Sequence, residues 1–347
     1  MKNHILIIVL LFSGIKVNAQ LTDVITGLSR PFGLVLNGNN LYIAENGAGK
    51  ISKIDITATN PTTSDVITGL DLPTDLIIDG NDLYISEHGI FGKVLKIDIS
   101  VASPSSSDVV TGLLRPWGIF LNGNDMYIAV TNERKISKID ITETNTTASD
   151  VATPNKLPTG LVLIGNDLYF SEVNFGSISK IDITETIPTV TNVVSGLNGP
   201  FGIELNGNYL YIAESEAGKI SKIDITEATP TPSDVVTGLN KPSDIAINGN
   251  DLYISEVNSN KISKYTLPSL TTDDSPLTNA NIAIPNPASN FIKITGLNKN
   301  YIIYDVLGKK INSGTIYNDK NIDIQNLTKG LYFIKLDNGN TIKFIKK

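Results

Sequence analysis

A segment of about 42 residues recurs six times between residues 23 and 266 of this 347-residue chain. Its leading motif is Asp-Val-x-Thr-Gly-Leu in most copies, and its valine stands at Val24, Val66, Val109, Val151, Val193 and Val235. Successive valines are 42, 43, 42, 42 and 42 residues apart. Self-similarity at such a period is typical of repeat architectures, so it constrains the fold more than any local motif does.

The clearest copy predicts four short strands, at 203–206, 210–214, 219–225 and 234–237. An Asn-Gly pair at 206–207 favours a tight hairpin turn, because both residues tolerate positive φ angles. The second strand is apolar at consecutive positions, which is typical of a strand buried on both faces. Four antiparallel strands with a buried inner pair predict one blade of a β-propeller.

The ends of the repeat array predict how the ring closes. A lone fourth strand at 23–26 precedes the first complete unit, and the last unit ends after its third strand, at 261–266. We therefore expect 23–26 to complete the last blade. This strand exchange gives an all-β, six-bladed β-propeller without exposed strand edges.

The remaining segments predict export and a second domain. Residues 1–19 have the pattern of a signal peptide: Lys2, an apolar run at 5–12, and the small-residue cleavage site Val17-Asn18-Ala19. We expect the propeller at 20–267, a polar linker at 268–278 and a C-terminal domain at 279–347. The chain has no cysteine, hence no disulfide framework. No transmembrane segment is expected in the mature chain.

Charge is distributed unevenly between the two domains. The whole chain has a net charge of −7, although the last 69 residues hold ten Lys against four Asp, so the propeller is strongly acidic. An acidic propeller argues against nucleic acid and anionic membranes as partners. Because the C-terminal lysines are scattered among strand-like segments, they predict a small β-sandwich with solvated lysines rather than a nucleic-acid-binding arm.

Several C-terminal blocks occur in a familiar order. They are Pro-Asn-Pro-Ala at 285–288, Ile-Tyr-Asp-Val-Leu-Gly-Lys at 303–309, Gly-Leu-Tyr-Phe-Ile at 330–334 and Lys-Phe-Ile-Lys-Lys at 343–347. This region resembles the type A C-terminal sorting domain of the type IX secretion system of Bacteroidota. The resemblance implies that residues 279–347 engage the type IX machinery, cross the outer membrane and are then removed. The mature protein would be secreted or held at the cell surface.

The repeats themselves resemble NHL-type six-bladed propellers through the recurring pattern Pro-x-Gly-Ile-x-Leu, Leu-Tyr-Ile-Ala-Glu and Lys-Ile-Ser-Lys-Ile-Asp. That resemblance implies the fold and says almost nothing about activity.

Departures from the repeat indicate where a site could lie. Antiparallel strands place the loops before each first strand and after each second strand at the same end of the ring. All three arginines of the chain, its single tryptophan and the histidine His88 fall in or beside these loops. Arginine with an aromatic ring suits the binding of sugars, carboxylates or peptides. The predicted ligand-binding residues are Arg30, Asp75, Arg115, Trp117, Arg134 and Asp244.

Each of these assignments has an alternative. Phe32 and Phe201 are expected to fill space between blades, and for Trp117 this role and ligand contact both remain open. Asp75 and Asp244 stand where the other four units have Gly, so they either flank the channel and hold a cation or cap local turns. Arg30 and Arg115 either contact a ligand or pair with glutamates at strand ends.

Two further groups are expected to be structural. The Glu that closes the second strand recurs as Glu45, Glu87, Glu172, Glu214 and Glu256. Although a ring of carboxylates suits a metal, fivefold repetition favours a scaffold in which each Glu accepts backbone hydrogen bonds. His88 lies in a loop and has no identifiable nucleophile, so we expect an ordinary surface residue.

The sequence therefore favours an exported binding module for a glycan, peptide or protein, without catalytic residues, metal or cofactor. A divalent cation in the channel stays open as an alternative, and so does a metal-dependent hydrolase. The latter would resemble the senescence-marker and gluconolactonase propellers, which place an acidic metal ligand early in the first blade. This chain has Phe32 and Gly33 there, and it lacks the catalytic motifs GxSxG and HExxH.

Overall fold

The computed structural model describes residues 21–143, 147–154 and 156–267, and then 283–284, 288–294, 299–305, 309–316, 321–336 and 341–347. The chain divides into two compact units, Met1–Ser269 and Leu270–Lys347, and each is described by itself. The predicted signal peptide and linker lie outside the described residues. Apart from the short 3-10 helix η1 (Thr131–Glu133), the regular structure described is all β.

Six four-stranded antiparallel sheets form the first unit, and we number them as blades in chain order. Blade 1 contains β2 (Pro31–Asn37), β3 (Asn40–Glu45), β4 (Lys50–Asp55) and β5 (Ser64–Thr68). Blade 2 contains β6 (Pro73–Asp79), β7 (Asp82–Glu87), β8 (Gly92–Asp98) and β9 (Ser107–Leu113). Blade 3 contains β10 (Pro116–Asn122), β11 (Asp125–Val130), β12 (Lys135–Asp140) and β13 (Ser149–Ala152). Blade 4 contains β14 (Pro158–Ile164), β15 (Asp167–Glu172), β16 (Ser177–Asp182) and β17 (Thr191–Ser195). Blade 5 contains β18 (Pro200–Asn206), β19 (Tyr209–Glu214), β20 (Lys219–Asp224) and β21 (Ser233–Thr237). Blade 6 contains β22 (Pro242–Asn248), β23 (Asp251–Glu256), β24 (Lys261–Thr266) and β1 (Leu21–Thr26).

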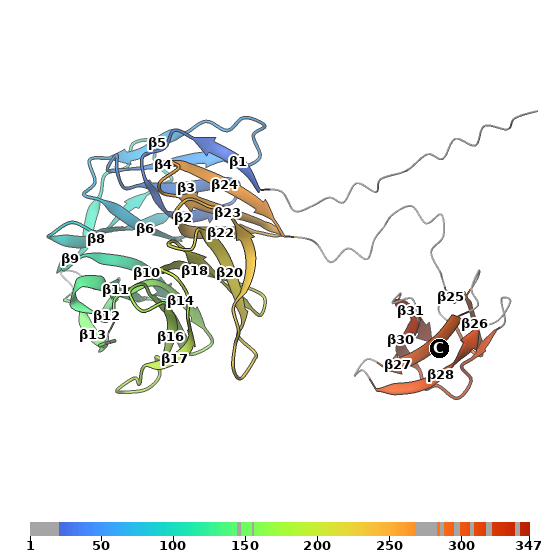
Figure 1. Ribbon diagram of the computed structural model, residues 1–347. Helices are drawn as coiled ribbons and strands as arrows, with labels where there is room; N and C mark the ends of the chain where they lie inside the picture. Colours follow the sequence, from blue (N-terminus) through green and yellow to red (C-terminus); the bar gives the residue numbers. More distant parts are fainter. Residues whose placement is uncertain are drawn as a thin grey trace, which may run out of the picture. The chain divides into compact units, whose positions relative to one another are not determined.

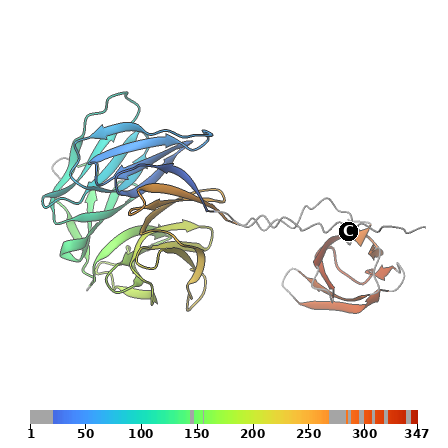
Figure 2. The ribbon, with the colours of Figure 1, turned by 45° about the horizontal axis from the view of Figure 1, so that its top comes forward.

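The first strand of each blade lies nearest the middle of the ring and the fourth strand lies outermost (Figure 1). Figure 2 shows the same sheets turned about the horizontal axis. Each second strand is buried along almost its whole length, as its continuous apolar sequence predicts. The reason is that it packs against blades on both sides: Tyr42 and Ala44 of β3, for example, share one cluster with Leu83 and Ile85 of β7.

Ring closure follows the predicted strand exchange. β1 pairs antiparallel with β24, so that Leu21 lies opposite Tyr265 and Thr26 opposite Lys261. The Lys261 ammonium bonds the Asp23 carboxylate at 2.6 Å, and the Leu28 N–H donates to the Asn260 carbonyl at 3.0 Å. The first described strand therefore completes the last blade and covers an edge that β24 would otherwise expose.

Neighbouring first strands approach one another closely near the axis. A Cβ built on Gly33 would lie 2.5 Å from the Thr74 carbonyl oxygen, and one on Gly118 would lie 2.1 Å from the Thr159 carbonyl oxygen. Contacts this short exclude a side chain without backbone movement, which explains why glycine recurs at this point of the repeat.

The C-terminal unit contains two small antiparallel sheets. One has the order β25 (Ala283–Ile284), β26 (Phe291–Ile294), β29 (Ile322–Asp323). The other has the order β28 (Lys310–Ile316), β27 (Lys299–Asp305), β30 (Gly330–Leu336), β31 (Thr341–Lys346). Ile292 from the first sheet shares a core with Ile303 and Phe344 from the second, as in the predicted small sandwich. Among the described residues, no helix is long and apolar enough to cross a membrane.

Candidate functional site

Backbone hydrogen bonds join the two sets of loops that were expected to share one end of the ring. Within blade 1 the Asn46 N–H donates to the Arg30 carbonyl at 3.2 Å, and within blade 3 the Thr131 N–H donates to the Arg115 carbonyl at 3.2 Å. Equivalent bonds occur in the other four blades. We call this face, formed by the loops before the first strands and after the second strands, the loop-rich end.

The three arginines lie at the loop-rich end with exposed side chains. Arg30, Arg115 and Arg134 all have left-handed backbones, with φ of 49°, 58° and 55°. A non-glycine residue in this region costs about 1 kcal/mol or more. None of the three guanidinium groups forms an ion pair within the described residues. The alternative that Arg30 and Arg115 pair with strand-end glutamates is wrong, because those glutamates have other partners.

Those partners explain the recurring glutamate. The carboxylate of Glu45 accepts the Ser29 N–H at 2.9 Å and lies 3.4 Å from the Lys50 ammonium. Matching backbone bonds to the preceding loop are made by Glu87, Glu214 and Glu256, at 2.9, 2.8 and 2.8 Å. These four carboxylates are buried and tie their blades to the preceding loops, so the scaffold interpretation is confirmed for Glu45, Glu87, Glu214 and Glu256.

In blade 4 the buried carboxylate of Glu172 accepts hydrogen bonds from side chains, those of Lys156, Ser177 and Ser179. Ser177 opens β16 where blades 1, 2, 5 and 6 have a lysine close to the glutamate. Here the ammonium comes instead from Lys156, in the loop before β14. It lies 3.1 Å from Glu172 and 2.9 Å from the Ser177 hydroxyl. Lys156 is therefore held by the scaffold.

Three aromatic side chains meet at the ring axis beneath the loop-rich end. Phe32, Trp117 and Phe201 occupy equivalent positions in blades 1, 3 and 5, and the same position in blades 2, 4 and 6 holds a buried Thr or Ser. Ring centroids are 5.3 Å apart for Phe32–Trp117 and 5.2 Å apart for Trp117–Phe201. Because blades 1, 3 and 5 are not neighbours, these contacts cross the axis. The aromatics therefore form a cap over the channel, and the expectation that they fill space between blades is wrong.

His88 belongs to this aromatic cap. Its ring lies edge-on to Trp117 with centroids 4.8 Å apart, and its Nδ1 lies 3.2 Å from the Pro116 carbonyl oxygen. Burial lowers the pKa of His88, which keeps the ring neutral at physiological pH. The side chain is half-buried against Trp117, so the expectation of an ordinary surface residue is wrong.

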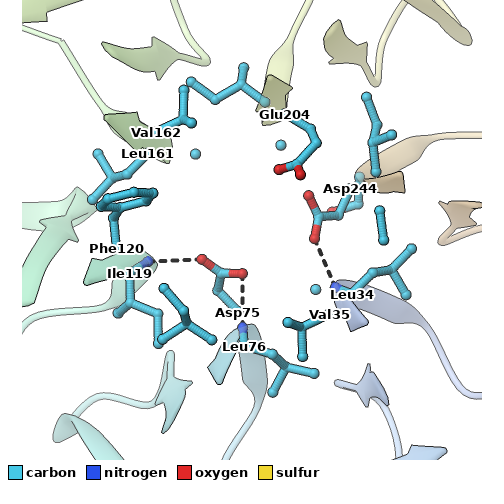
Figure 3. A pocket seen from close by; sticks show the side chains of 18 of the residues that line it. Leu34, Val35, Asp75, Leu76, Ile119, Phe120, Leu161, Val162, Glu204 and Asp244 are labelled. Carbon is cyan, nitrogen blue, oxygen red and sulfur yellow. Dashed lines mark hydrogen bonds between the residues drawn. The ribbon is translucent and has the colours of Figure 1, made fainter. Parts of the chain in front are cut away.

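A cavity of about 340 Å³ lies in the channel below the aromatic cap (Figure 3). Residues from the first strands of all six blades line it, and Trp117 of β10 is among them. Asp75 of β6 and Asp244 of β22 point into this space. Of the six predicted ligand-binding residues, Asp75, Trp117 and Asp244 therefore meet at the cavity, whereas the three arginines lie on loops.

Both aspartates also bond the first strand of the following blade. The Asp75 Oδ2 accepts the Ile119 N–H at 2.8 Å, and the Asp244 Oδ2 accepts the Leu34 N–H at 2.8 Å. Asp75 additionally accepts the N–H of its neighbour Leu76 at 2.8 Å. The alternative prediction was that both aspartates cap turns within their own blades. Their main hydrogen bonds instead join two neighbouring blades.

A third acid in the cavity was missed from the sequence. Figure 3 shows the carboxyl group of Glu204 pointing into the cavity toward Asp244. Equivalent positions in the other blades are apolar; they are Val35, Ile77, Phe120, Val162 and Ala246. Comparing the six first strands position by position would have revealed this departure.

Burial favours the neutral forms of the three acids, and neighbouring acids reinforce this for Glu204 and Asp244. Burial, reinforced by the nearby Asp75, raises the pKa of Glu204 to about 7. Burial raises the pKa of Asp75 to about 6, and burial together with Asp75 raises that of Asp244. No Lys, Arg or His lines the cavity, so the described walls provide no opposite charge. Within the described residues, no group of three or more His, Cys, Asp or Glu is arranged to hold a metal ion.

Comparison with protein families identifies the C-terminal unit. Residues 283–347 match the family model described as "Secretion system C-terminal sorting domain". A sequence search of curated proteins found no match.

Solved structures similar to the chain share its propeller fold. A structural genomics protein of unknown function from Bacteroides thetaiotaomicron VPI-5482 gives a TM-score of 0.56 at 14% identity, covering 72% of each chain. Virginiamycin B lyase from Staphylococcus aureus gives 0.52 at 17% identity, covering 72% of this chain and 99% of that one. The PQQ domain of pyranose dehydrogenase from Coprinopsis cinerea gives 0.57 at 11% identity, covering 72% and 96%.

At these identities the likeness shows the fold alone. Together with the family match, it shows an exported β-propeller, carried to the cell surface or secreted by a C-terminal sorting domain of the type IX secretion system.

Proposed function

We propose that the propeller is an extracellular binding module whose loop-rich end holds a partner that carries anionic groups. The observation that supports this function is the position of Arg30, Arg115 and Arg134. All the arginines of the chain lie on one end, exposed and without ion pairs among the described residues.

Folding alone gives little reason for this arrangement. An exposed guanidinium adds almost nothing to stability, and the left-handed backbone at each position is unfavourable. Elsewhere the propeller uses lysine for ion pairs, as between Lys219 and both Glu214 and Asp234. Arginine differs from lysine in its planar fork, which binds carboxylate, sulfate or phosphate groups through two parallel hydrogen bonds.

Exposed apolar side chains accompany the arginines. Ile90 and Phe91 follow β7 and are 72% and 87% exposed, and Phe175 follows β15 and is 62% exposed. Leu114 precedes Arg115 and is 45% exposed. Aromatic and aliphatic groups beside arginine are typical of the centres of binding interfaces.

The metal-dependent hydrolase is not favoured by the start of the first blade. Such an enzyme would place an acidic ligand there, but Phe32 packs in the aromatic cap and Gly33 lies against the backbone of Thr74. Neither residue offers a side-chain oxygen.

A panel of immobilised anionic polysaccharides and acidic peptides, with neutral dextran as reference, tests the proposal. We expect the triple variant Arg30→Ala/Arg115→Ala/Arg134→Ala to lose at least about tenfold in affinity, equivalent to about 1.4 kcal/mol. Its Tm should stay within a few degrees of the parent. Lys53→Ala/Lys222→Ala/Lys264→Ala is the matched control, because it also removes three positive charges, all from third strands. Unchanged binding by the arginine variant, or equal loss in the lysine control, would contradict this function.

A further inference from the structure

We infer that the channel cavity is a second binding site, for a small organic ammonium ion with an apolar body. Its cationic head would be held by Glu204, Asp75 and Asp244. This site is separate from the loop-rich end, because the aromatic cap of Phe32, Trp117 and Phe201 lies between them.

Glu204 is the residue that points most directly to a ligand. Its carboxyl group is directed into the cavity, and it makes no hydrogen bond or ion pair with any described residue. The apolar residues at the five equivalent positions show that this fold does not need a carboxyl group there. Glu204 is half-buried, and a carboxyl group withdrawn from bulk water without a partner is unfavourable, so an external partner accounts for it better than folding does.

The aspartates complete the coordination of a cationic head. Asp75 and Asp244 each accept a backbone N–H of the next blade, and Asp75 accepts the Leu76 N–H with its other oxygen; these contacts fix the orientation of the carboxyl groups. A carboxylate has about four acceptor positions, so both retain acceptor capacity on the cavity side. An ammonium group has three donors, which matches three carboxyl groups that come from different blades.

Most of the remaining side chains of the wall are apolar, although Thr74 and Ser243 also line it, and this favours an organic cation over a bare metal ion. Ile77, Ile119, Phe120 and Val162 line the cavity, and Trp117 lies at its capped end. Metal ions of the calcium type require six or more oxygen ligands, whereas an alkyl or aryl body gains from apolar contact. An indole ring also attracts a cation placed over its face. A volume of about 340 Å³ is within the usual range for small-ligand pockets.

Cation binding is expected to change the protonation of these acids. A positive charge beside a carboxyl group favours its ionised form, so binding should release protons near neutral pH. Proton release distinguishes a ligand held by the acids from one that merely occupies the apolar space.

Trp117 provides the measurement, because it is the single tryptophan of the chain and lies at the cavity. Its fluorescence is followed in the full chain while phenethylamine, the neutral analogue 2-phenylethanol, or calcium chloride is added at pH 7.5. We expect a saturable change with the amine, at least a tenfold weaker response to the alcohol, and none with calcium. Proton release by the amine is measured in parallel by calorimetry in two buffers of different ionisation enthalpy.

Two variants complete the test. Glu204→Gln keeps the shape of the side chain and should weaken amine binding at least tenfold and reduce the proton release, leaving only the part that comes from Asp75 and Asp244. Glu227→Gln makes the same charge change on an exposed turn and should leave both unchanged. The inference is wrong if the amine gives no saturable response, if amine and alcohol bind equally, or if Glu204→Gln binds as well as the parent. A calcium response that depends on Glu204 would also overturn it and would assign the cavity to a metal instead.

Discussion

The substitution Glu204→Gln should make the unliganded propeller more stable at high pH and leave its stability unchanged at low pH. In the folded chain Glu204 titrates at about 7, against an ordinary value of 4.5. The folded state therefore binds more protons than the unfolded state between these values, so stability falls as pH rises through this window. Glutamine has no charge to bury and removes this loss.

The magnitude follows from the same two values. Each pH unit between them corresponds to about 1.4 kcal/mol, which gives an upper bound of about 3 kcal/mol at pH 8. Since Glu204 is partly accessible from the cavity, we expect about 2 kcal/mol. Asp75 and Asp244 face the same space and add to the pH dependence in the same direction, and no basic group lines the cavity to oppose it.

Urea unfolding followed by Trp117 fluorescence measures the effect, because this tryptophan reports on the propeller unit. Parent and variant are compared at pH 4.5 and at pH 8, with Glu227→Gln as control. A variant that is less stable than the parent at pH 8, or a difference that is equal at both pH values, would refute this account of the cavity.

Two further predictions concern the scaffold. Deleting residues 21–28 removes β1 and the buried Leu28. Losing a buried leucine side chain lowers the free energy of unfolding by about 2–5 kcal/mol, so we expect Tm to fall by about 10 °C. An unchanged Tm would contradict ring closure by β1. Lys156→Ala leaves the buried Glu172 without an ammonium partner and should destabilise the propeller by about 2 kcal/mol or more. Lys156→Ala/Ser177→Lys restores the lysine position of the other blades and should recover much of that loss; a double variant no more stable than the single one would show that Lys156 acts differently.

The sequence predicted the architecture well because its repeat encodes it locally. The Asn-Gly turns, the doubly apolar second strands and the missing strand at each end are all short-range features, and together they defined six blades and their closure. The sequence did not predict that Lys156 takes the place of the strand lysine beside Glu172 in blade 4. Both substitutions, Lys156 and Ser177, are nevertheless visible in the repeat. Only the folded chain shows that Lys156, in the loop before β14, and Ser177, at the start of β16, contact the same carboxylate.

The site was predicted in part, for a physical reason. The arginine and aspartate residues that depart from the repeat were assigned to one end of the ring, because strand direction determines which end a loop occupies. Strand direction does not determine how deep along the channel axis a side chain lies. Asp75 and Asp244 follow the aromatic-cap position by one residue, and that single step places them below the cap while Arg30 and Arg115 stay above it. Glu204 was missed because the comparison of units was confined to loop residues, whereas the channel is lined by the first strands.

The pairing of β1 with β24 also sets an order of events during folding. Asp23 and Lys261 are 238 residues apart in the chain, so β1 must wait until almost the whole propeller has emerged before it finds its partner. Blades 1 to 5 are each built from consecutive strands and can form early, but the sixth depends on the slow closure of a very long loop. Until then, two open strand edges remain available to other chains. A chain that folds only after crossing the inner membrane would therefore spend its most aggregation-prone interval in the periplasm, before the sorting domain delivers it outward.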